Sequence, residues 1–307
     1  MKTITGIAKM QEFSRQVRTG GLTIGFVPTM GFLHEGHLEL VRQARRDADV
    51  VVVSIFVNPT QFNRSDDFES YPRDEERDHD LLCAERVDVL FTPSAADVYT
   101  PGAATSVAVE GLTGSLCGPR RPGHFEGVTT VVASLFNMVL PDFAVFGEKD
   151  YQQLQVIRRM TADLHFPVRI DSSPTVREAD GLAMSSRNAR LSAADRELAP
   201  LVSRALTTAL QAFAQGERRA AALQDVARNV LAALDQFEVE YLDVVDGQTL
   251  QPVDTADESS VIAIAAWLGG VRLIDNIVFS RWPAEYASTG QRPETPQITE
   301  TGVPSDA

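Results

Sequence analysis

The sequence predicts an α/β protein in which a parallel sheet is followed by a separate, smaller α+β domain. Short apolar runs alternate with amphipathic helical runs up to about Asp171, which is typical of a parallel sheet with right-handed crossovers. After Pro174 the pattern changes to two helical runs followed by strand-like runs. Helices and strands segregated in this way indicate an α+β unit with its own core.

The first part of the chain carries four or five strand signals. The predicted strands span 22–27, 50–57, 87–91, 143–146 and 168–171, with a short strand-like stretch at 106–109. The predicted helices span 7–19, 36–47, 74–84, 127–140 and 151–164. The run at 50–57 is almost continuously apolar and β-branched, as expected of a central strand covered on both faces. We expect Pro28 to end the first of these strands.

The second part predicts two helices and then three strands. Ser192 and Asp195 resemble a capping box for a helix that reaches about Gln215. A second helix is expected at 218–234, and strands at 237–241, 261–267 and 273–279. Residues 287–307 have almost no large apolar side chain and are expected to be disordered. The expected domains are therefore 1–175 and 176–286.

Composition restricts the class of function. The 307 residues are 44% hydrophobic and 23% charged, with a net charge of −14 and a pI near 4.8. This sign argues against a protein that neutralises many phosphates along a nucleic acid, although a local basic cluster can still bind a small anion. The sequence shows no membrane-length apolar run and no signal-peptide core. We therefore expect a cytoplasmic protein in which Cys83 and Cys117 only pack.

The first candidate site is the stretch from Pro28 to His37. It follows the strand at 22–27 and leads into the helix at 36–47, where backbone N–H groups at a helix start can bind phosphate. His34 and His37 are three residues apart and project from one helix face. Each can donate to a phosphate oxygen, and the helix dipole disfavours their protonation until an anion binds. Ordinary surface or metal-binding histidines are the alternative.

Two further clusters suit a phosphate. Gly147-Glu148-Lys149-Asp150 follows a strand end, where open α/β sheets bind ligands, and Gln153 lies one turn further. Lys149 supplies a point charge, whereas a charged helix cap is the alternative. Met184-Ser185-Ser186-Arg187 joins two hydroxyl groups to a guanidinium, which suits a migrating phosphate charge, but in isolation it reads as a loop.

Three weaker features complete the candidates. Asn58 and Gln61 offer neutral hydrogen bonds at a strand end. Asp78, after Tyr71-Pro72-Arg73, could hold Mg²⁺ through water or lie on a solvated helix face. Arg120, Arg121 and His124 form a cationic loop beside Gly118 and Gly123, or a simple surface loop.

Five motifs follow one another along the chain. They are Thr-Met-Gly-x-Leu-His-x-Gly-His from Thr29, Asn-Pro-x-Gln-Phe from Asn58, Tyr-Pro-Arg from Tyr71, Phe-Gly-Glu-Lys-Asp-Tyr-Gln-Gln from Phe146, and Arg-Glu-x-Asp-Gly-Leu-Ala-Met-Ser-Ser-Arg-Asn from Arg177. In this order they resemble the pantothenate synthetase (pantoate–β-alanine ligase) family. The resemblance extends over about residues 1–286, nearly everything except the tail.

The resemblance implies a fold and a reaction. The family belongs to a nucleotidyltransferase superfamily with the His-x-Gly-His motif, and has a Rossmann-like amino-terminal domain and a smaller carboxyl-terminal lid domain. Its members activate pantoate with Mg-ATP, release pyrophosphate, and let β-alanine attack the pantoyl adenylate to give pantothenate and AMP. They are cytoplasmic and usually dimeric. A hinged second domain carrying Arg187 could shield the reactive adenylate from water.

The resemblance also assigns residues. His34, His37, Lys149 and Arg187 would be catalytic. The ATP site would comprise Met30, Gly31, Phe32, Leu33, His34, Glu35, Gly36, His37, Gly147, Glu148, Lys149, Asp150, Val176, Met184, Ser185, Ser186 and Arg187. The substrate site would comprise Pro28, Thr29, Asn58, Gln61 and Gln153, with pantoate on Gln61 and Gln153 and β-alanine also near Gln61. Asp78 matches a family acid near the magnesium, but it follows Arg77, where some relatives carry a second acid.

Two other functions fit parts of the sequence. The histidine motif alone also suits another nucleotidylyltransferase, although the neutral Asn58, Gln61 and Gln153 disfavour a phosphate-bearing acceptor. A silent nucleotide-sensing module or a tRNA-binding relative is the third reading. The retained histidines, Lys149 and Arg187 argue against a silent module, and the negative charge argues against tRNA.

Overall fold

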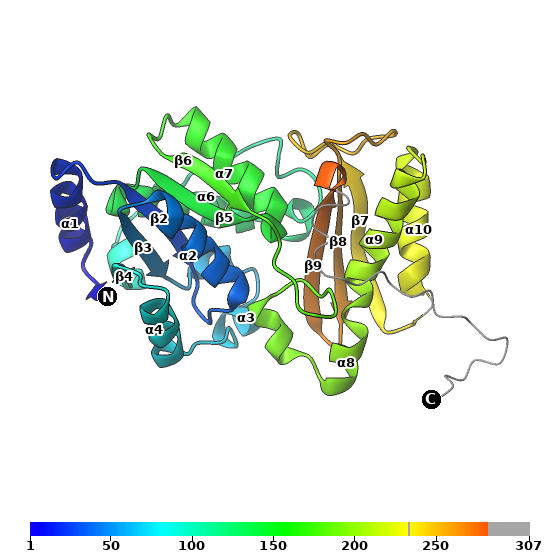
Figure 1. Ribbon diagram of the computed structural model, residues 1–307, viewed down its shortest axis with the longest axis horizontal. Helices are drawn as coiled ribbons and strands as arrows, with labels where there is room; N and C mark the ends of the chain where they lie inside the picture. Colours follow the sequence, from blue (N-terminus) through cyan, green and yellow to red (C-terminus); the bar gives the residue numbers. More distant parts are fainter. Residues whose placement is uncertain (233, 282–307) are drawn as a thin grey trace.

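A computed structural model of the chain describes residues 1–232 and 234–281. The predicted disorder of 287–307 and the last residues of the predicted second domain lie outside the described residues. Figure 1 shows two layered bodies side by side, a parallel α/β body and a smaller body in which helices cover an antiparallel sheet. The predicted fold class is confirmed, whereas the boundary at residue 175 stays a prediction.

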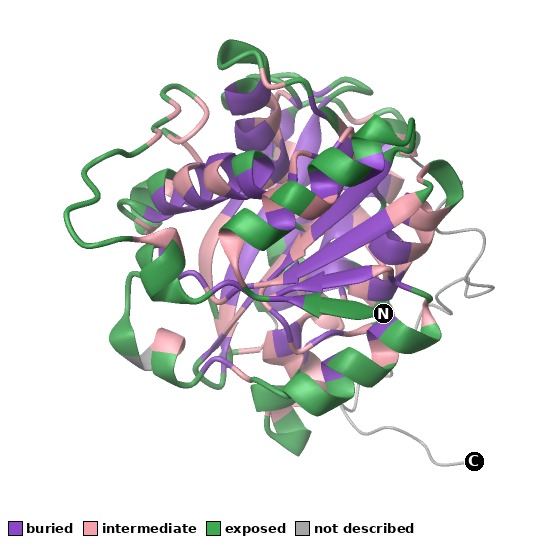
Figure 2. Cartoon of the chain, turned by 90° about the vertical axis from the view of Figure 1, so that its left-hand side faces the viewer, coloured by how far each residue is buried: buried purple, intermediate pink, exposed green. Residues whose placement is uncertain are grey.

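In the described part of the chain, six parallel strands form the larger sheet in the order β1-β4-β3-β2-β5-β6. They are β1 Lys2–Ile4, β2 Ile24–Thr29, β3 Val50–Ile55, β4 Val89–Phe91, β5 Phe143–Gly147 and β6 Arg169–Ser173. Figure 2 shows that the central strands are buried and that the helices around them expose their outer faces. β1 was not predicted, because it is only three residues long and lies at the edge of the sheet.

Helices cover both faces of this sheet. They are α1 Ile7–Thr19, α2 Glu35–Asp47, α3 Ser65–Glu69, α4 Glu75–Ala84, α5 Ala95–Val98, α6 His124–Val139 and α7 Tyr151–Asp163. Val41 of α2 and Leu82 of α4 pack with Val51 and Val53 of β3 on one face. Met10 of α1, Phe136 of α6 and Ile157 of α7 share the core of the other face. Side chains alternate along β3, which explains its continuous apolar run.

Two sequence predictions in this domain are wrong. Pro28 does not end β2, because it lies within the strand opposite Ser54. The Thr29 carbonyl accepts the Phe56 N–H on the β3 side, so the nitrogen of the preceding residue, Pro28, faces β5. The pairing of β2 with β5 ends at Phe26, so no hydrogen bond to β5 is lost at Pro28. The stretch at 106–109 is not a strand either. Its Val107 N–H donates to the Thr130 hydroxyl of α6 at 2.9 Å rather than to another strand.

In the described residues after 176, three antiparallel strands form the smaller sheet. They are β7 Phe237–Val245, β8 Val261–Leu268 and β9 Val271–Val278, in that order. The helices are α8 Ala193–Leu198, α9 Leu201–Ala214 and α10 Ala220–Ala232. Apolar side chains of α9 and α10 form one core with β7 and β8. Figure 1 shows both helices on one side of this sheet.

The single helix predicted from Ser192 to Gln215 is two helices. The Ser192 hydroxyl caps α8 by accepting the Asp195 N–H at 3.1 Å, as the sequence predicts. α8 ends at Leu198, and α9 begins after Pro200. Proline has no N–H to continue the helix and favours the first turn of a new one.

The smaller sheet contacts the turn that follows β5. Asn276 of β9 donates to the carbonyls of Glu148 and Lys149 at 2.9 and 2.8 Å, just after β5. Tyr151 packs against an apolar cluster of the smaller domain and donates to the Gly247 carbonyl at 3.0 Å. Short 3-10 turns lie at these junctions, namely Pro59–Gln61, Gly118–Arg120, Glu148–Asp150, Ser186–Arg190 and Phe279–Arg281. Among the described residues, the search for a helix able to span a membrane found none.

Candidate active site

A cavity of about 230 Å³ opens at the carboxyl ends of β2, β3 and β5. Most of the predicted site residues line it. From the ATP set these are Met30, His34, Gly36, His37, Gly147, Lys149, Asp150, Val176, Met184, Ser185, Ser186 and Arg187; from the substrate set they are Pro28, Thr29, Asn58, Gln61 and Gln153. Parallel strands end at the same edge of a sheet, which brings together motifs that lie far apart in the sequence.

The turn after β2 has a strained backbone. Gly31 and Phe32 both adopt positive φ angles, of 81° and 50°. A Cβ atom at position 31 would lie 3.0 Å from the Asp78 carboxylate, so glycine is required there on two grounds. The carboxylate accepts the N–H groups of Phe32 and Leu33, each at 2.7 Å. These charge-assisted bonds offset the strain and fix the turn.

These contacts give Asp78 a different role from the predicted metal ligand. Its side chain is buried, it does not line the cavity, and both carboxylate oxygens are bound to backbone N–H groups. Burial raises the pKa of this carboxyl. The neighbouring Arg77 donates to the Leu33 carbonyl at 2.9 Å, so it also holds the turn. Among the described residues no group of three or more metal-ligating side chains is present.

His34 and His37 form a pair at the start of α2. Their ring centroids are 4.0 Å apart. The His34 N–H donates to Nδ1 of His37 at 3.3 Å, so a neutral His37 carries its proton on Nε2. Within the described part of the chain, Nδ1 of His34 is buried without a hydrogen-bond partner. Both rings line the cavity, so the Nε2 atoms are the ring nitrogens that a ligand there could reach.

Burial keeps both rings neutral in the free protein. It lowers the pKa of His34 to about 4, with the Lys149 ammonium as a second cause. It lowers the pKa of His37 to about 3, with His34 itself as the next cause. A bound polyphosphate would oppose both effects, because negative charge favours the imidazolium. At neutral pH the free protein therefore presents neutral imidazole donors.

Gly36 explains the spacing of the histidine motif. A Cβ atom at this position would lie 2.9 Å from Cε1 of His34. The His34 ring therefore packs directly over the backbone of Gly36. Only glycine leaves room for the ring at this place.

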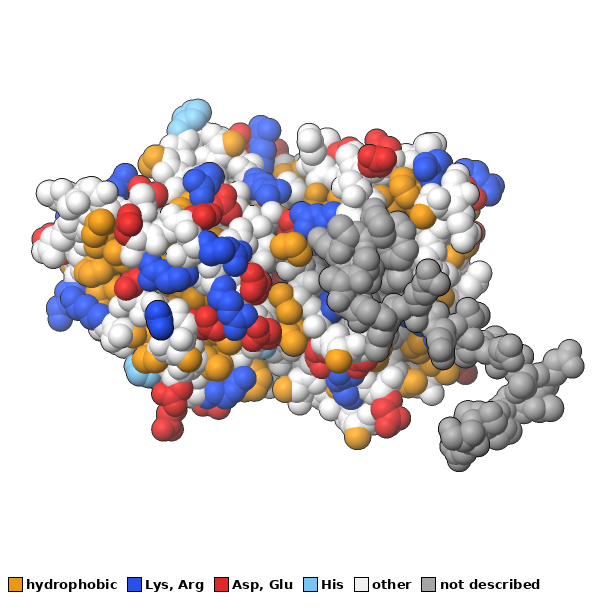
Figure 3. Space-filling model, viewed as in Figure 1, with side chains coloured by type: hydrophobic (Ala, Val, Ile, Leu, Met, Phe, Trp, Pro, Cys, Tyr) orange, Lys and Arg blue, Asp and Glu red, His pale blue; other side chains and the backbone are white. Residues whose placement is uncertain are grey.

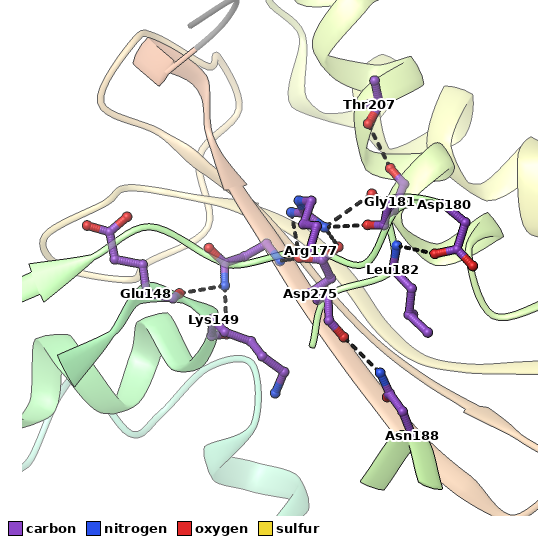
Figure 4. A network of polar contacts seen from close by, with 12 residues as sticks. Glu148, Lys149, Arg177, Asp180, Gly181, Leu182, Asn188, Thr207 and Asp275 are labelled. Atoms are coloured by element: carbon purple, nitrogen blue, oxygen red, sulfur yellow. Dashed lines mark hydrogen bonds and ion pairs between the residues drawn. The ribbon is translucent and has the colours of Figure 1, made fainter. Parts of the chain in front are cut away.

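Lys149 and Glu148 point in opposite directions, as Figure 4 shows. Lys149 lines the cavity, and its Nζ lies 3.7 Å from the Asp150 carboxylate. Burial alone would raise the pKa of Asp150, but Lys149 and Arg187 lower it below its usual value. Glu148 is buried away from the cavity, where it accepts from the Ser172 hydroxyl at 2.7 Å and pairs with Arg281. Its side chain therefore supports the fold, and a contact of Glu148 with ATP stays a prediction.

The segment 176–190 brings Arg187 to the cavity. Arg177 and Asp275 of β9 form a two-point ion pair at 2.6 and 3.0 Å, and both side chains are buried. Asn188 donates to the Ala183 carbonyl at 3.1 Å and so closes the loop on itself. Figure 4 shows this network between the loop and β9. Beyond it, the Ser186 hydroxyl donates to the Phe32 carbonyl at 3.1 Å and ties the segment to the histidine turn.

Asn58 positions Gln61 and has no hydrogen bond left for a substrate. Its amide donates to Oε1 of Gln61 at 3.2 Å and to the Gly127 carbonyl at 3.1 Å. Its oxygen accepts from the Tyr99 hydroxyl at 2.7 Å and from Thr60. These four bonds fill the capacity of one amide. The structure therefore makes Asn58 a support for Gln61 rather than a direct ligand.

The sequence prediction missed the importance of Arg121 and His124, which it treated as an exposed loop or a mobile cationic one. His124 is buried, and both residues line the cavity. Nδ1 of His124 contacts the Gln61 carbonyl at 2.8 Å, and Nε2 lies 3.0 Å from the Arg121 guanidinium. Burial lowers the pKa of His124 to about 3. In the sequence, only the clustering of two arginines and a histidine close to two glycines indicated that this loop belongs to the site.

The remaining predicted ATP residues do not line the cavity. Gly31, Phe32 and Leu33 shape the turn through the backbone contacts described above. The Glu35 side chain turns outward and pairs with Arg42. The backbone geometry of the turn is enough to explain why these residues are part of the motif. Their side chains do not reach the cavity.

The charge at the cavity is opposite to that of the whole protein. Lys149, Arg187 and Arg121 face one carboxylate, that of Asp150, among the cavity residues that the structure describes. Elsewhere basic and acidic side chains are interspersed, as on the face drawn in Figure 3. A small anion is therefore attracted to this cavity despite the net charge of −14.

Comparison with known proteins places the chain in one family. Residues 2–278 match the family described as pantoate-beta-alanine ligase. The chain is 53% identical to the pantothenate synthetase of Heliobacterium modesticaldum, over 91% of this chain and 99% of the relative. It is 51% identical to that of Geobacter sulfurreducens, over 91% and 98% of the two chains.

Solved structures agree. The crystal structure of pantothenate synthetase from Thermus thermophilus has a TM-score of 0.85 at 46% identity, covering 91% of this chain and 99% of that one. A pantoate-beta-alanine ligase from Francisella tularensis, complexed with beta-gamma ATP and beta-alanine, has a TM-score of 0.75 at 32% identity and covers 91% and 98%. The likeness extends through both domains and so goes well beyond the histidine motif. The chain belongs to the pantoate–β-alanine ligase family.

Proposed function

We propose that this protein condenses pantoate with β-alanine to give pantothenate, using ATP and releasing AMP and pyrophosphate. The observation that carries the proposal is the convergence of the histidine pair, Lys149 and Arg187 on one cavity from three separate segments. These groups supply hydrogen bonds and positive charge, and the family supplies the reaction. The Francisella relative was crystallised with beta-gamma ATP and beta-alanine.

In the first step a pantoate carboxylate oxygen attacks the α-phosphorus of ATP. The bond from the α-phosphorus to the bridging oxygen breaks, and its electron pair leaves with pyrophosphate. An anion attacks an anion here, so the protein must provide positive charge and in-line positioning. Lys149, Arg187 and the N–H donors of His34 and His37 line the cavity and would face the phosphates, and the Ser185 hydroxyl would add a donor.

In the second step the amine of β-alanine attacks the acyl carbon of the pantoyl adenylate. The carbon–oxygen bond to AMP breaks, and the attacking nitrogen loses a proton as the amide forms. Gln61 and Gln153 line the cavity where pantoate would lie, and Gln61 is oriented by Asn58. Gly147 and Val176 would hold the adenosine. The enclosed site protects the acyl adenylate from water.

A magnesium ion bound with ATP would neutralise charge on the β- and γ-phosphates. Asp150 is the carboxylate that lines the cavity in the described part of the chain, so it fits this role better than Asp78. Mg²⁺ commonly uses one or two carboxylates together with phosphate oxygens and water. The donor set present at this site is therefore sufficient for it.

We also propose that the protein is cytoplasmic and forms a homodimer, as the family resemblance implies. Cys83 and Cys117 are free thiols among the residues described, which suits a reducing compartment. Sedimentation equilibrium of the purified chain tests the dimer directly. A mass that stays at 33.5 kDa across the concentration range would contradict it.

The reaction is tested by incubating the protein with ATP, Mg²⁺ and pantoate. We expect AMP to accumulate over many turnovers only after β-alanine is added, with pantothenate detected by mass spectrometry. α-Alanine, an amine of the same composition, is the control for β-alanine and should not replace it. AMP release that ignores pantoate and β-alanine would reject the proposal.

A further inference from the structure

A second cavity lies beside the active-site cavity. It has a volume of about 200 Å³ and shares Lys149, Asp150, Ser185 and Arg187 with the first. It extends over β8 and β9 as far as Trp267 and Arg272 of the smaller domain. We call it the outer cavity. Because the two cavities share these residues, a group leaving the phosphate end of the active site would enter the outer one.

The outer cavity is strongly basic. Seven arginine and lysine residues line it against three acidic ones, counting the residues that the structure describes. Two of the three acids are already engaged. Glu240 accepts from Arg272 at 2.8 Å and from the Trp267 indole at 3.0 Å, and Asp150 lies beside Lys149. The third acid, Asp67, pairs with two arginines at once.

Asp67 bridges two arginines of the outer cavity. One carboxylate oxygen lies 2.9 Å from Nη2 of Arg187, and the other lies 3.0 Å from Nη1 of Arg190. All three side chains are partly exposed, at 26% for Asp67, 27% for Arg187 and 35% for Arg190. Guanidinium groups bind carboxylate and phosphate oxygens with the same geometry. Asp67 thus occupies the positions that two phosphate oxygens would take.

The two sides of this contact come from distant parts of the chain. Arg187 and Arg190 share the turn Ser186–Arg190, whereas Asp67 belongs to the five-residue helix α3. Burial alone would raise the pKa of Asp67, but its pairs with Arg187 and Arg190 lower it below the usual value. Asp67 is therefore ionised at neutral pH. Its partial exposure leaves the pair open to replacement by another anion.

We propose that the outer cavity receives pyrophosphate and that Asp67 is a positioning residue which competes with it for Arg187 and Arg190. The inference rests on the proposed function, which makes pyrophosphate the leaving group. Without ligand, the Asp67 carboxylate keeps the two guanidinium groups aligned. With pyrophosphate bound, phosphate oxygens take its place, and the return of Asp67 favours release. No covalent bond changes in this exchange of anions.

The test is calorimetric titration of the full-length chain with inorganic pyrophosphate. Asp67→Asn removes the competing charge, so pyrophosphate should bind about three- to fivefold more tightly, the scale of a partly exposed ion pair. Arg190→Gln removes a ligand, so it should bind about three- to fivefold more weakly. Glu69→Gln on the same helix is the matched control, because Glu69 is exposed and does not line the outer cavity.

Opposite signs separate this role from a purely structural one. A loss of folding would weaken binding in both variants, whereas competition predicts tighter binding in Asp67→Asn alone. Unchanged or weaker binding in Asp67→Asn would overturn the inference, and so would an equal gain in Glu69→Gln, which would indicate only a change of net charge. If Asp67→Asn does not fold, unchanged binding in Arg190→Gln is decisive against it.

The titration needs neither pantoate nor β-alanine, so it is independent of the ligase assay. Shifts of the expected sign without pantothenate synthesis would reject the proposed function and leave the anion exchange standing. Pantothenate synthesis without these shifts would support the proposed function and reject the anion exchange. A kinetic readout agrees with the titration when pyrophosphate inhibits Asp67→Asn more strongly than wild type in the presence of all three substrates.

Discussion

The cavity has two walls that are held in place by different means. The histidine wall, residues 28–37, is fixed by the buried Asp78 carboxylate, and its two rings are neutral. The arginine wall, residues 176–190, is anchored through Arg177 to β9 of the smaller domain. Its charged end is partly exposed and paired with the Asp67 carboxylate, which we propose that pyrophosphate displaces.

This difference matches what each wall would do in the proposed reaction. Neutral donors aimed at a transferring phosphate stabilise the transition state best when they are set in advance, because no reorganisation is then needed. Cations that bind a leaving anion must also release it, so an exchangeable partner is useful. One cavity thus combines a rigid wall and an adaptable one, and the following predictions test the two walls separately.

The largest effect is expected for Asp275→Asn, which breaks the anchor of the arginine wall. The variant removes the carboxylate charge that pairs with the buried Arg177 guanidinium, so the free energy of unfolding should fall by about 3–5 kcal/mol. Because the anchor also places Arg187, kcat should fall as well. Urea unfolding and steady-state kinetics measure the two effects. Asp225→Asn, an exposed acid on α10, is the control and should leave both unchanged.

An apolar double variant sharpens the same comparison. Arg177→Met combined with Asp275→Leu buries no unpaired charge, so it should be more stable than Asp275→Asn. It still lacks the two-point contact that orients the wall. Equal instability of the two variants would mean that the buried charge left in Asp275→Asn is not the cause of its lower stability.

The next effect is expected for His37→Ala in the histidine wall. Removing one preset donor to the transferring phosphate should lower kcat by about 100-fold or more, with little change in stability. His79→Ala is the matched control, since that imidazole is exposed on α4 outside the cavity. A kcat within a few-fold of wild type would remove His37 from the chemistry. Lys149→Ala should behave in the same way.

The smallest effect concerns pH and the neutral rings. The pKa values of His34 and His37 are lowered to about 4 and about 3 in the folded protein. Between these values and the unfolded value near 6.5, the unfolded chain binds more protons. The stability that the neutral rings contribute is therefore complete above about pH 6.5 and is lost as the pH falls.

Replacing one ring should flatten this dependence. His37→Gln removes one titrating group, so between about pH 5 and pH 7 the slope of unfolding free energy should fall by at most about 1.4 kcal/mol per pH unit. The change will be smaller than this limit because the ring opens onto the cavity and is screened. Urea unfolding at several pH values measures it. An unchanged slope in His37→Gln would show that its ring is not held neutral by burial.

Much of the fold could be predicted from local patterns. The strand at 50–57 and the helices at 7–19 and 151–164 carry strong periodic signals, and each was found within two residues of its prediction. β1 was missed because three residues carry no periodicity. The break at Pro200 was missed because apolar spacing continues across it, although proline is a known reason for a helix to end.

The site was predicted where the chemistry lies in the motif itself. His34, His37, Lys149 and Arg187 line one cavity, as expected from their positions after strand ends. Asp78 was interpreted as a metal ligand, since a sequence cannot show that its carboxylate is used up by two backbone N–H groups. Arg121 and His124 were underestimated for a related reason, because their loop folds inward onto Gln61.

The sequence by itself determined the order of elements, the positions of the histidine, lysine and arginine motifs, and the family to which they belong. These follow from spacing along the chain, which is a local property. Only the tertiary structure decided that Asp78 holds the histidine turn, that Asn58 supports Gln61, and that Asp67 lies between Arg187 and Arg190. Such pairings join segments up to about 120 residues apart. They depend on which strand ends the sheet brings together, and no local pattern encodes that.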